Sequence, residues 1–313
     1  MSEKIAILMG GLSAEREVSI MSGEAVATAL DAEGFNVVKI DAGKDLWVQL
    51  TRANPDIIFN CLHGVWGEDG RVQGVLDLFG KPYTHSGVLS SALAMDKHRA
   101  KIVLKAAGIR VPSGKLVDRQ LAAQKHVLPR PYVIKPNCEG SSVGVYIIPK
   151  TATRPPLDIA MNEKMGTQVL AEKFAPGREL TVSVMNGKAL CVTEIIAHTD
   201  FYDYEAKYAD GGSSHVVPAK IPKQVAQICM DWAEKAHIAL GCRGLTRSDF
   251  RYDDKKTAKK ATKKDIVNKI VMLELNTQPG MTPRSLAPEQ AEATGMNFRQ
   301  LCRWIVEDAT WPR

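Results

Sequence analysis

The feature that most constrains this chain is a pair of apolar segments in its C-terminal third that carry polar residues two positions apart. VMLELN places Glu274 and Asn276 in this pattern, and LTRSDF does the same with Arg247 and Asp249. Side chains two positions apart on a β-strand point to one face. If these strands form a hairpin, Asp249 joins Glu274 and Asn276 in one cluster of hard oxygen ligands suited to Mg²⁺. Two ordinary strands with polar solvent faces would show the same alternation.

Length and composition are typical of a globular protein with more than one domain. At 313 residues the chain is long enough for about two or three domains. No apolar run approaches the length needed to span a bilayer, and the N-terminal MSEKIAILMGG lacks the design of a signal peptide. The six cysteines are scattered without a CxxC pair, which is typical of reduced thiols. We therefore expect a cytoplasmic protein with no membrane partner.

The net charge of +6 has a local origin. The segment 253–265, DDKKTAKKATKKD, holds six lysines, and removing these from the 41 basic residues leaves 35 against 35 acidic residues. No aromatic residue interleaves with the lysines to stack on bases. We expect this segment to be a solvated loop, and we expect no nucleic-acid partner.

The first part of the sequence alternates strand-like runs with a helical segment. The strand-like runs are 4–9, 36–40 and 56–61, and the helix between the first two begins near Ser13, which can cap it. This rhythm predicts a parallel sheet with helices packed on it. Ligands bind such sheets at the carboxyl ends of the strands, where Glu15 is expected to lie in the first helical turn.

Two glycine-containing motifs belong to this predicted sheet. The pair Gly10-Gly11 raises the alternative of a NAD-dependent dehydrogenase, but GGLSAE lacks the spacing GxGxxG that a dinucleotide site requires. The motif HGVWGEDGRVQG begins at His63 and brings further polar groups to the end of a strand. Taken alone, this motif is equally compatible with a plain loop and a following helix.

A glycine- and serine-rich loop separates two predicted strands in the middle of the chain. PYVIKP carries Lys135 near its end, NCEGSSVG follows at 137–144, and VYII resumes a strand. Such a loop can lay backbone amides over phosphate groups, with Lys135 as a nearby cation. A plain hairpin turn is the alternative, because the P-loop pattern is absent. Lys97, in a predicted amphipathic helix at 90–108, would by itself be a surface charge.

The C-terminal half contains one long irregular segment between regular elements. The segment 199–219 is polar and aromatic, with Lys207 and Tyr208 at its centre. A connection of this length is usually a functional lid or a disordered segment. Amphipathic helices are predicted at 224–240 and 296–309.

Seven sequence blocks match one protein family in the same order along essentially the whole chain. They are GGLSAEREVS, HGVWGEDGRVQG, MDKHRAK, VIKPNCEGSSVG, FYDYEAKY, GLTRSDF and ELNTQPGMTPRSL. Together they resemble the D-alanine–D-alanine ligases of the ATP-grasp superfamily. The resemblance implies an α/β and α+β fold, in which an N-terminal parallel α/β domain precedes an ATP-grasp fold of two antiparallel-sheet domains. The expected domains are a substrate-binding domain (1–98), a central domain (99–180) and a C-terminal domain with the lid and metal site (181–313).

The resemblance also implies a reaction. ATP would drive the joining of two D-alanine molecules to D-alanyl-D-alanine, a precursor of peptidoglycan in the bacterial cell wall. The carboxylate of the first substrate would attack the γ-phosphate of ATP and form D-alanyl phosphate. The amine of the second D-alanine would then attack the carbonyl carbon, and phosphate would leave.

The resemblance assigns residues to the nucleotide and its metal ions. Two Mg²⁺ ions, with Mn²⁺ as an alternative, would be bound by Asp249, Glu274 and Asn276. The residues expected to bind ATP are Lys97, Lys135, Ser141, Ser142, Glu172, Lys173, Ala175, Glu179 and Lys207. Among them, Glu172, Lys173 and Ala175 match the segment that reads adenine, and Glu179 matches the residue that holds the ribose hydroxyls. The lysines would neutralise phosphate charge, as phosphoryl transfer requires.

The resemblance assigns a second set to the amino acids. The residues expected to bind them are Glu15, His63, Lys207, Ser285 and Leu286. Glu15 matches the residue that receives the ammonium group of the first D-alanine, and His63 lies beside it. Ser285, helped by Lys207, matches the contact to the carboxylate of the second D-alanine.

A third set is expected to act in catalysis. Its members are Glu15, Ser141, Tyr208, Arg247 and Gly280. Arg247 and the amide of Gly280 would stabilise the oxyanion of the tetrahedral intermediate. Ser141 and Tyr208 resemble the partners that tie Glu15 to the lid.

Three further expectations accompany the resemblance. The family implies a homodimer. Relatives that make D-alanyl-D-lactate typically have another residue at Tyr208, so the sequence favours the dipeptide over this alternative product. A nucleotide-binding protein without catalysis is disfavoured, because the expected metal ligands and Arg247 are present. We also hypothesise that alkylation of Cys138, in the phosphate-covering loop, slows turnover.

Overall fold

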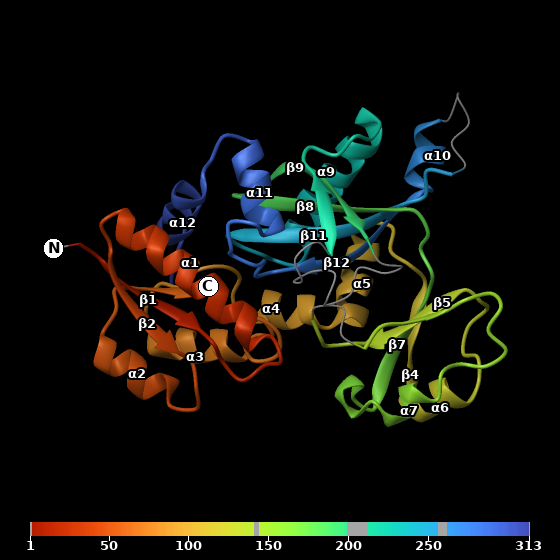
Figure 1. Cartoon of the computed structure of the whole chain (residues 1–313), viewed down its shortest axis with the longest axis horizontal. Coiled ribbons are helices and arrows are strands. Elements are labelled where there is room, and N and C mark those ends of the chain that lie inside the picture. Colours follow the sequence, from red (N-terminus) through yellow and green to blue (C-terminus); the bar gives the residue numbers. More distant parts are fainter. Residues whose placement is uncertain (1, 141–143, 199–211, 256–261, 313) are drawn as a thin grey trace.

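The described residues form three separate sheets, which follow one another along the sequence (Figure 1). The computed structural model describes residues 2–140, 144–198, 212–255 and 262–312. Four predicted site residues therefore lie outside the described residues: Ser141, Ser142, Lys207 and Tyr208. Within the described ranges, no helix combines the length and the apolar character needed to cross a bilayer.

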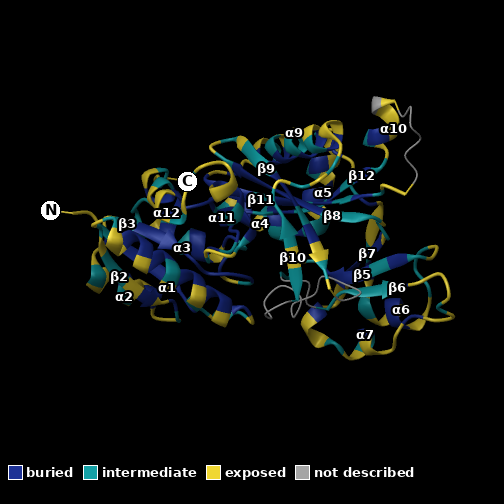
Figure 2. Ribbon diagram, turned by 45° about the horizontal axis from the view of Figure 1, so that its top comes forward, coloured by how far each residue is buried: buried dark blue, intermediate teal, exposed yellow. Residues whose placement is uncertain are grey.

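The first sheet is parallel, as the strand–helix–strand rhythm predicts. Its strands lie in the order β2 (Asn36–Asp41), β1 (Lys4–Met9), β3 (Ile57–Asn60), and its helices are α1 (Arg16–Ala32), α2 (Leu46–Ala53) and α3 (Arg71–Phe79). Alternate residues of β1 enter two different cores: Ile5 and Ile7 pack in one, and Ala6 and Leu8 in the other. Burial on both faces explains why this strand is an unbroken apolar run (Figure 2).

The start of α1 differs from the prediction. The helix begins at Arg16 with Glu15 as its N-cap, and no side chain caps it. The Ser13 hydroxyl instead donates to the backbone oxygen of His63 at 2.7 Å and accepts from the backbone nitrogen of Glu15 at 3.1 Å. The expectation that Ser13 caps the helix is therefore wrong, because its side chain joins the loops after β1 and β3.

The second sheet is antiparallel and small. Its strands lie in the order β4 (Gly114–Asp118), β7 (Gln168–Lys173), β5 (Tyr132–Pro136), β6 (Tyr146–Ile148), and it carries α6 (Arg119–Gln124), α7 (Asp158–Met161) and the short 3₁₀ helix η1 (Glu163–Met165). Tyr132, Ile134 and Val169 are fully buried in its core. The predicted strand–loop–strand arrangement around 137–144 is the antiparallel pair β5 and β6.

The third sheet is antiparallel and carries the predicted hairpin. Its strands lie in the order β10 (Ser213–Val216), β9 (Lys188–Ala197), β8 (Arg178–Met185), β11 (Leu245–Tyr252), β12 (Ile270–Asn276), and its helices are α9 (Lys223–Ala239), α10 (Lys263–Val267) and α11 (Leu286–Ala293). Strands β11 and β12 are antiparallel neighbours, with Asp249 opposite Glu274 and Arg247 opposite Asn276. The hairpin prediction is confirmed.

The other helices of the described residues are α4 (Val88–Met95) and α5 (Lys97–Ala106), between the first and second sheets, and α12 (Phe298–Glu307), after the third sheet. The single helix predicted over 90–108 is wrong, since the chain breaks at Asp96, whose extended backbone (φ −77°, ψ 91°) starts α5. Its carboxylate caps α5 by accepting from the backbone nitrogen of Arg99 at 3.0 Å. Helix α5 contributes Leu104 to the core beneath the third sheet, whereas α12 packs on α1. The expected division at 98 and 180 stays a prediction.

Candidate active site

One cavity of about 810 Å³ is lined by residues from the regions of all three sheets. Every predicted site residue within the described ranges lines it: Glu15, His63, Lys97, Lys135, Glu172, Lys173, Ala175, Glu179, Arg247, Asp249, Glu274, Asn276, Gly280, Ser285 and Leu286. Residues far apart in the sequence are thus brought to one place, while their individual roles stay predictions.

The β11–β12 hairpin supplies an acidic face of this cavity. The guanidinium group of Arg247 binds Asp249 through two nitrogen–oxygen contacts of 3.0 Å. The hydroxyl of Thr181, on neighbouring β8, donates to Asp249 at 2.7 Å. Such bidentate, charge-assisted bonds fix a side chain in one orientation. Asp249 therefore sets the direction of Arg247, and the two act as one unit.

The donor set on this face fits a divalent cation that also binds phosphate. Asp249, Glu274 and Asn276 provide hard oxygen atoms from adjacent strands. Among the described residues, no group of three or more His, Cys, Asp or Glu side chains is placed to hold a metal ion. Protein carboxylates alone would not complete a coordination shell here. Phosphate oxygens and water complete such shells around Mg²⁺ in nucleotide sites.

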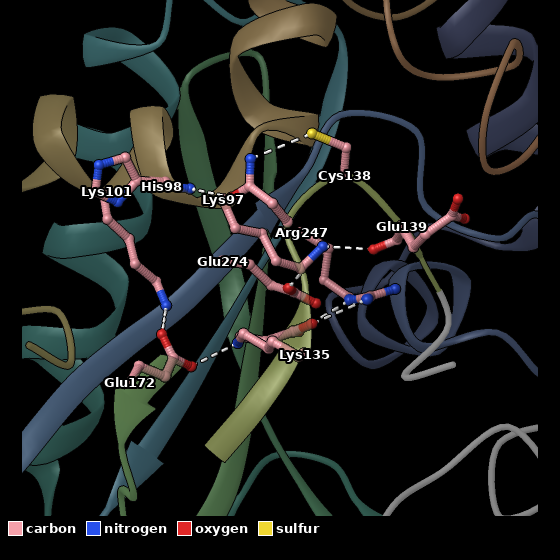
Figure 3. Close-up of polar contacts among 11 residues, drawn as sticks. Lys97, His98, Lys101, Lys135, Cys138, Glu139, Glu172, Arg247 and Glu274 are labelled. Carbon is pink, nitrogen blue, oxygen red and sulfur yellow. Dashed lines mark hydrogen bonds and ion pairs between the residues drawn. The ribbon is translucent and has the colours of Figure 1, made fainter. Parts of the chain in front are cut away.

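Lysines from two elements face these carboxylates (Figure 3). The ammonium group of Lys97, the first residue of α5, lies 3.6 Å from Glu274 and donates to the backbone oxygen of Glu139 at 2.5 Å. The ammonium group of Lys135, on β5, lies 2.6 Å from Glu172. Lys101, one turn after Lys97 on α5, binds the other carboxylate oxygen of Glu172. The result is a cluster of ammonium groups around two carboxylates.

Burial and mutual charge shift the pKa values of this cluster. Burial and, to a lesser extent, the neighbouring charge of Lys135 lower the pKa of Lys101 to about 8, although the carboxylate of Glu172 opposes this shift. For Lys135, burial is outweighed by Glu172 and Glu274, which raise its pKa above the usual value. For Glu172, burial is likewise outweighed, and the two lysines lower its pKa. Glu172 and Lys135 are therefore a charged pair at neutral pH.

The predicted adenine and ribose residues lie on β7, β8 and the turn between them. Glu179 is 2.7 Å from the guanidinium group of Arg251, which also donates to the backbone oxygen of Ala175 at 3.2 Å. Both carboxylate oxygens of Glu172 are held by lysines. Glu172 thus connects the end predicted to bind the base with the lysines predicted to bind the phosphates.

Two carboxyl groups lie together at the end predicted to receive the first amino acid. Glu15 is buried, and burial together with the charge of Glu15 raises the pKa of Glu68 to about 8. Burial also lowers the pKa of His63, so the imidazole is neutral at pH 7. A Cβ on Gly140 would lie 2.5 Å from a Glu15 oxygen, so a larger residue here would force the Glu15 carboxylate to move.

The residues predicted to bind the second amino acid lie where the loop after β12 enters α11. The hydroxyl of Ser285 accepts from the backbone nitrogen of Thr282 at 3.1 Å and is 2.8 Å from the Thr282 hydroxyl. The loop is anchored by Gln278, which accepts from Asn60 at 2.7 Å and donates to the backbone oxygen of Leu62. These bonds connect the loop after the third sheet to the end of β3. They bring the predicted binding sites of the first and second amino acids together.

Sequence reasoning assigned no role to several polar residues of this site. They are Glu68, Lys101, His215, Arg251 and Glu289. Lys101 stands four residues after Lys97 and so on the same helix face, a spacing that could have indicated it. Glu68 lies within HGVWGEDG, but nothing in that motif distinguishes it from its neighbours. Arg251, His215 and Glu289 are brought in by strand register and packing, which no local pattern reveals.

The arrangement of the sheets defines the class of protein. A parallel α/β unit followed by two antiparallel sheets that share one polar cavity is the ATP-grasp architecture. The family model described as the D-ala D-ala ligase C-terminus matches residues 104–307, and the model for the D-ala D-ala ligase N-terminus matches residues 4–54 and 45–86. The chain belongs to the D-alanine–D-alanine ligase family and is an enzyme of that family.

Individual relatives agree over nearly the full length. The chain is 56% identical to a D-alanine–D-alanine ligase of Caulobacter vibrioides over 97% of this chain and 92% of the relative. It is 53% identical to one from Ruegeria sp. strain TM1040 over 99% and 97%. Among solved structures, it resembles the D-alanine–D-alanine ligase of Bacillus anthracis complexed with ATP, with a TM-score of 0.78, 30% identity and coverage of 98% and 97%.

Proposed function

We propose that this protein joins two D-alanine molecules to D-alanyl-D-alanine at the expense of ATP, through a D-alanyl phosphate intermediate. The observation that carries the proposal is the convergence of three kinds of group in one cavity. These are ammonium groups suited to phosphates, oxygen donors suited to Mg²⁺, and a buried carboxylate suited to an amino group. The family and its near-full-length relatives support the same reaction.

In the first step, the carboxylate of one D-alanine attacks the γ-phosphate of ATP, and ADP leaves as D-alanyl phosphate forms. Lys97 and Lys135 bring positive charge to the phosphates, and Glu15 receives the ammonium group of the amino acid. Asp249, Glu274 and Asn276 would hold two Mg²⁺ ions, which when bound supply further neutralisation of phosphate charge. Phosphoryl transfer depends mainly on such positioning and charge neutralisation.

In the second step, the amine of the other D-alanine attacks the carbonyl carbon of D-alanyl phosphate. Arg247, held by Asp249, and the amide of Gly280 stabilise the oxyanion that forms. The hydroxyl of Ser285 donates a hydrogen bond to the carboxylate of the incoming D-alanine. Collapse of the tetrahedral intermediate then expels phosphate and leaves the new peptide bond.

The state and place of the enzyme are part of the proposal. A homodimer is supported by the family and by exposed apolar side chains on two helices that pack together, Leu78 on α3 and Leu89 on α4. A cytoplasmic location is supported by the unpaired thiols of all six cysteines and by the use of ATP. Sedimentation analysis of the purified protein tests the dimer.

The test of the reaction is phosphate release from ATP and Mg²⁺ with D-alanine alone and with D-alanine plus D-lactate, with products identified by mass. Release that requires D-alanine and yields the dipeptide is the expected result. Depsipeptide as the main product would overturn the choice of second substrate. Absence of phosphate release in both mixtures would overturn the proposed reaction.

A further inference from the structure

A hydrogen-bonded pair outside the predicted set lies at the Ser285 end of the cavity. The Nδ1 atom of His215, on β10, is 2.6 Å from a carboxylate oxygen of Glu289, on α11. Both residues line the cavity, and their side chains are only 18% and 27% exposed. The Nε2 atom of His215 is buried and has no hydrogen-bond partner among the described residues. The bond to Glu289 therefore sets the orientation of this ring.

The pair connects the third sheet to the first turn of α11. Glu289 lies one turn after Ser285, and its backbone nitrogen donates to the backbone oxygen of Ser285 at 3.0 Å. Side chains four residues apart lie on one face of a helix. On the sheet side, His215 is opposite Ile195, which packs against Leu286. The hydrogen bond between His215 and Glu289 and this apolar contact together hold the turn that carries Ser285 and Leu286.

The charge of Glu289 matters to any anion that binds at this end. The N-terminus of a helix favours a carboxylate, and Ser285 stands at the N-terminus of α11. A carboxylate of Glu289 one turn further on would repel that anion if it were left uncompensated. His215 supplies the compensating group, since its Nδ1–H donates a hydrogen bond of 2.6 Å to the Glu289 carboxylate.

We propose that His215 and Glu289 are a positioning pair for the second amino acid. The hydrogen bond from His215 offsets the negative charge of Glu289 beside the site of the incoming carboxylate, and it braces the turn that binds this carboxylate. The inference rests on the proposed function and deepens it, because it names what sets the affinity for the second D-alanine. Neither residue takes part in phosphoryl transfer.

The experiment compares three variants of the full-length enzyme: His215→Gln, Glu289→Gln and the double variant. Dipeptide formation against D-alanine concentration gives the Michaelis constant of the second substrate. Trapping of D-alanyl phosphate by hydroxylamine at low D-alanine reports the first step without the second amino acid. His198→Gln is the matched control, because His198 also binds the β10 strand, at Ser214 (3.2 Å), but is exposed and does not line the cavity.

His215→Gln is expected to raise the Michaelis constant of the second D-alanine by about tenfold or more, because it leaves Glu289 uncompensated. Hydroxamate formation and the Michaelis constant for ATP are expected to stay within about twofold of the wild-type values. All constants of the control variant are also expected to stay within about twofold of wild type. Glu289→Gln is expected to change the Michaelis constant of the second D-alanine by less than about threefold. In the double variant this constant is expected to return close to the wild-type value. Thermal unfolding of each variant shows whether it is folded.

Three results would overturn the inference. One is an unchanged second Michaelis constant in His215→Gln. Another is a loss of hydroxamate formation in His215→Gln as large as its loss of dipeptide formation, which would indicate a general structural defect. The third is a double variant as impaired as His215→Gln, which would exclude charge compensation. Wild-type enzyme that makes no dipeptide would overturn the proposed function and this inference with it, whereas active wild type with unaffected variants would overturn the inference alone.

Discussion

The ammonium group of Lys135 lies 2.6 Å from a carboxylate oxygen of Glu172, and the two side chains are only 10% and 4% exposed. The other carboxylate oxygen of Glu172 binds Lys101 (Figure 3). One carboxylate is thus shared by two buried ammonium groups. A buried charge is tolerated only when it is paired, so both lysines depend on Glu172.

Glu172→Gln is expected to destabilise the protein by about 3–5 kcal/mol, because it leaves two buried cations without their counter-charge. Lys101→Met removes one cation, leaves Lys135 and Glu172 as a matched pair, and is expected to change stability by about 1 kcal/mol or less. Urea unfolding of both variants at pH 7 measures the difference. Equal destabilisation by the two substitutions would contradict the idea that Glu172 is the shared partner.

Glu274 is the predicted metal ligand that faces Lys97, at 3.6 Å. Glu274→Gln keeps the shape of the side chain and removes its charge. We expect phosphate release to fall by more than about 100-fold. Even substitution of a residue that only hydrogen-bonds to a metal ligand lowers metal affinity or activity by about 10–100-fold. The melting temperature is expected to stay close to wild type, because this side chain is 34% exposed.

Phosphate release over a series of Mg²⁺ concentrations, together with thermal unfolding, checks this expectation. Glu234→Gln is a suitable control, because Glu234 also pairs with a lysine, Lys188 at 3.7 Å, and lies outside the cavity lining. Near-wild-type activity of Glu274→Gln at low Mg²⁺ would show that the metal assignment is wrong.

The parts of the fold that the sequence predicts are those with a strong local period. Alternation in VMLELN and LTRSDF fixes which side chains share a face, and the structure pairs these segments with Asp249 opposite Glu274. The helix break at Asp96 escaped prediction, because neither proline nor glycine marks it. There the carboxylate of Asp96 competes with the helix by capping the next one.

The parts of the site that could not be predicted depend on contacts between distant residues. Lys101 and Glu172 are 71 positions apart, and His215 and Glu289 are 74 apart. Neither pair belongs to a local pattern, since α5 meets β7 and α11 meets β10 only through packing. The family resemblance supplied the residues predicted to touch substrates, whereas the residues that hold these in place emerged only from the structure.

Glu68 gives a prediction for the pH dependence of stability. Burial and the charge of Glu15 raise the pKa of Glu68 from its ordinary value of 4.5 to about 8. Between these values the folded protein binds more protons than the unfolded chain at this group, so stability falls as pH rises through the window. Glu68→Gln cannot ionise. We expect Glu68→Gln to become more stable relative to the wild type as the pH rises from about 5 to about 8. Above about pH 8 the difference between the two free energies of unfolding should stay constant.

Urea unfolding of the wild type and of Glu68→Gln at several pH values from about 4.5 to 9 measures this difference. Below the ordinary pKa of a glutamate both proteins carry a neutral group, so the two stabilities should converge. A difference that does not vary with pH would mean that Glu68 has the same pKa in the folded and unfolded states, and the raised pKa would be refuted.

Cys138 lies in the loop after β5, and it is the exposed one of the six cysteines. Partial burial and the nearby charge of Asp96 raise the pKa of its thiol, so alkylation should accelerate as the pH rises above neutral. The next residue, Glu139, offers its backbone oxygen to Lys97 at 2.5 Å. A bulky adduct on Cys138 is expected to displace this oxygen and with it the lysine predicted to bind phosphate.

We therefore expect iodoacetamide to modify Cys138 first and to slow phosphate release by about tenfold, because misplacing a positioning group by about 1 Å can cost 100-fold. Mass spectrometry locates the adduct, and phosphate release is measured at each extent of modification. Cys138→Ser should remain active and should not be inhibited by iodoacetamide, because the serine hydroxyl is small and does not react with this reagent. An enzyme that is fully alkylated at Cys138 and fully active would show that this loop does not need its position to hold Lys97.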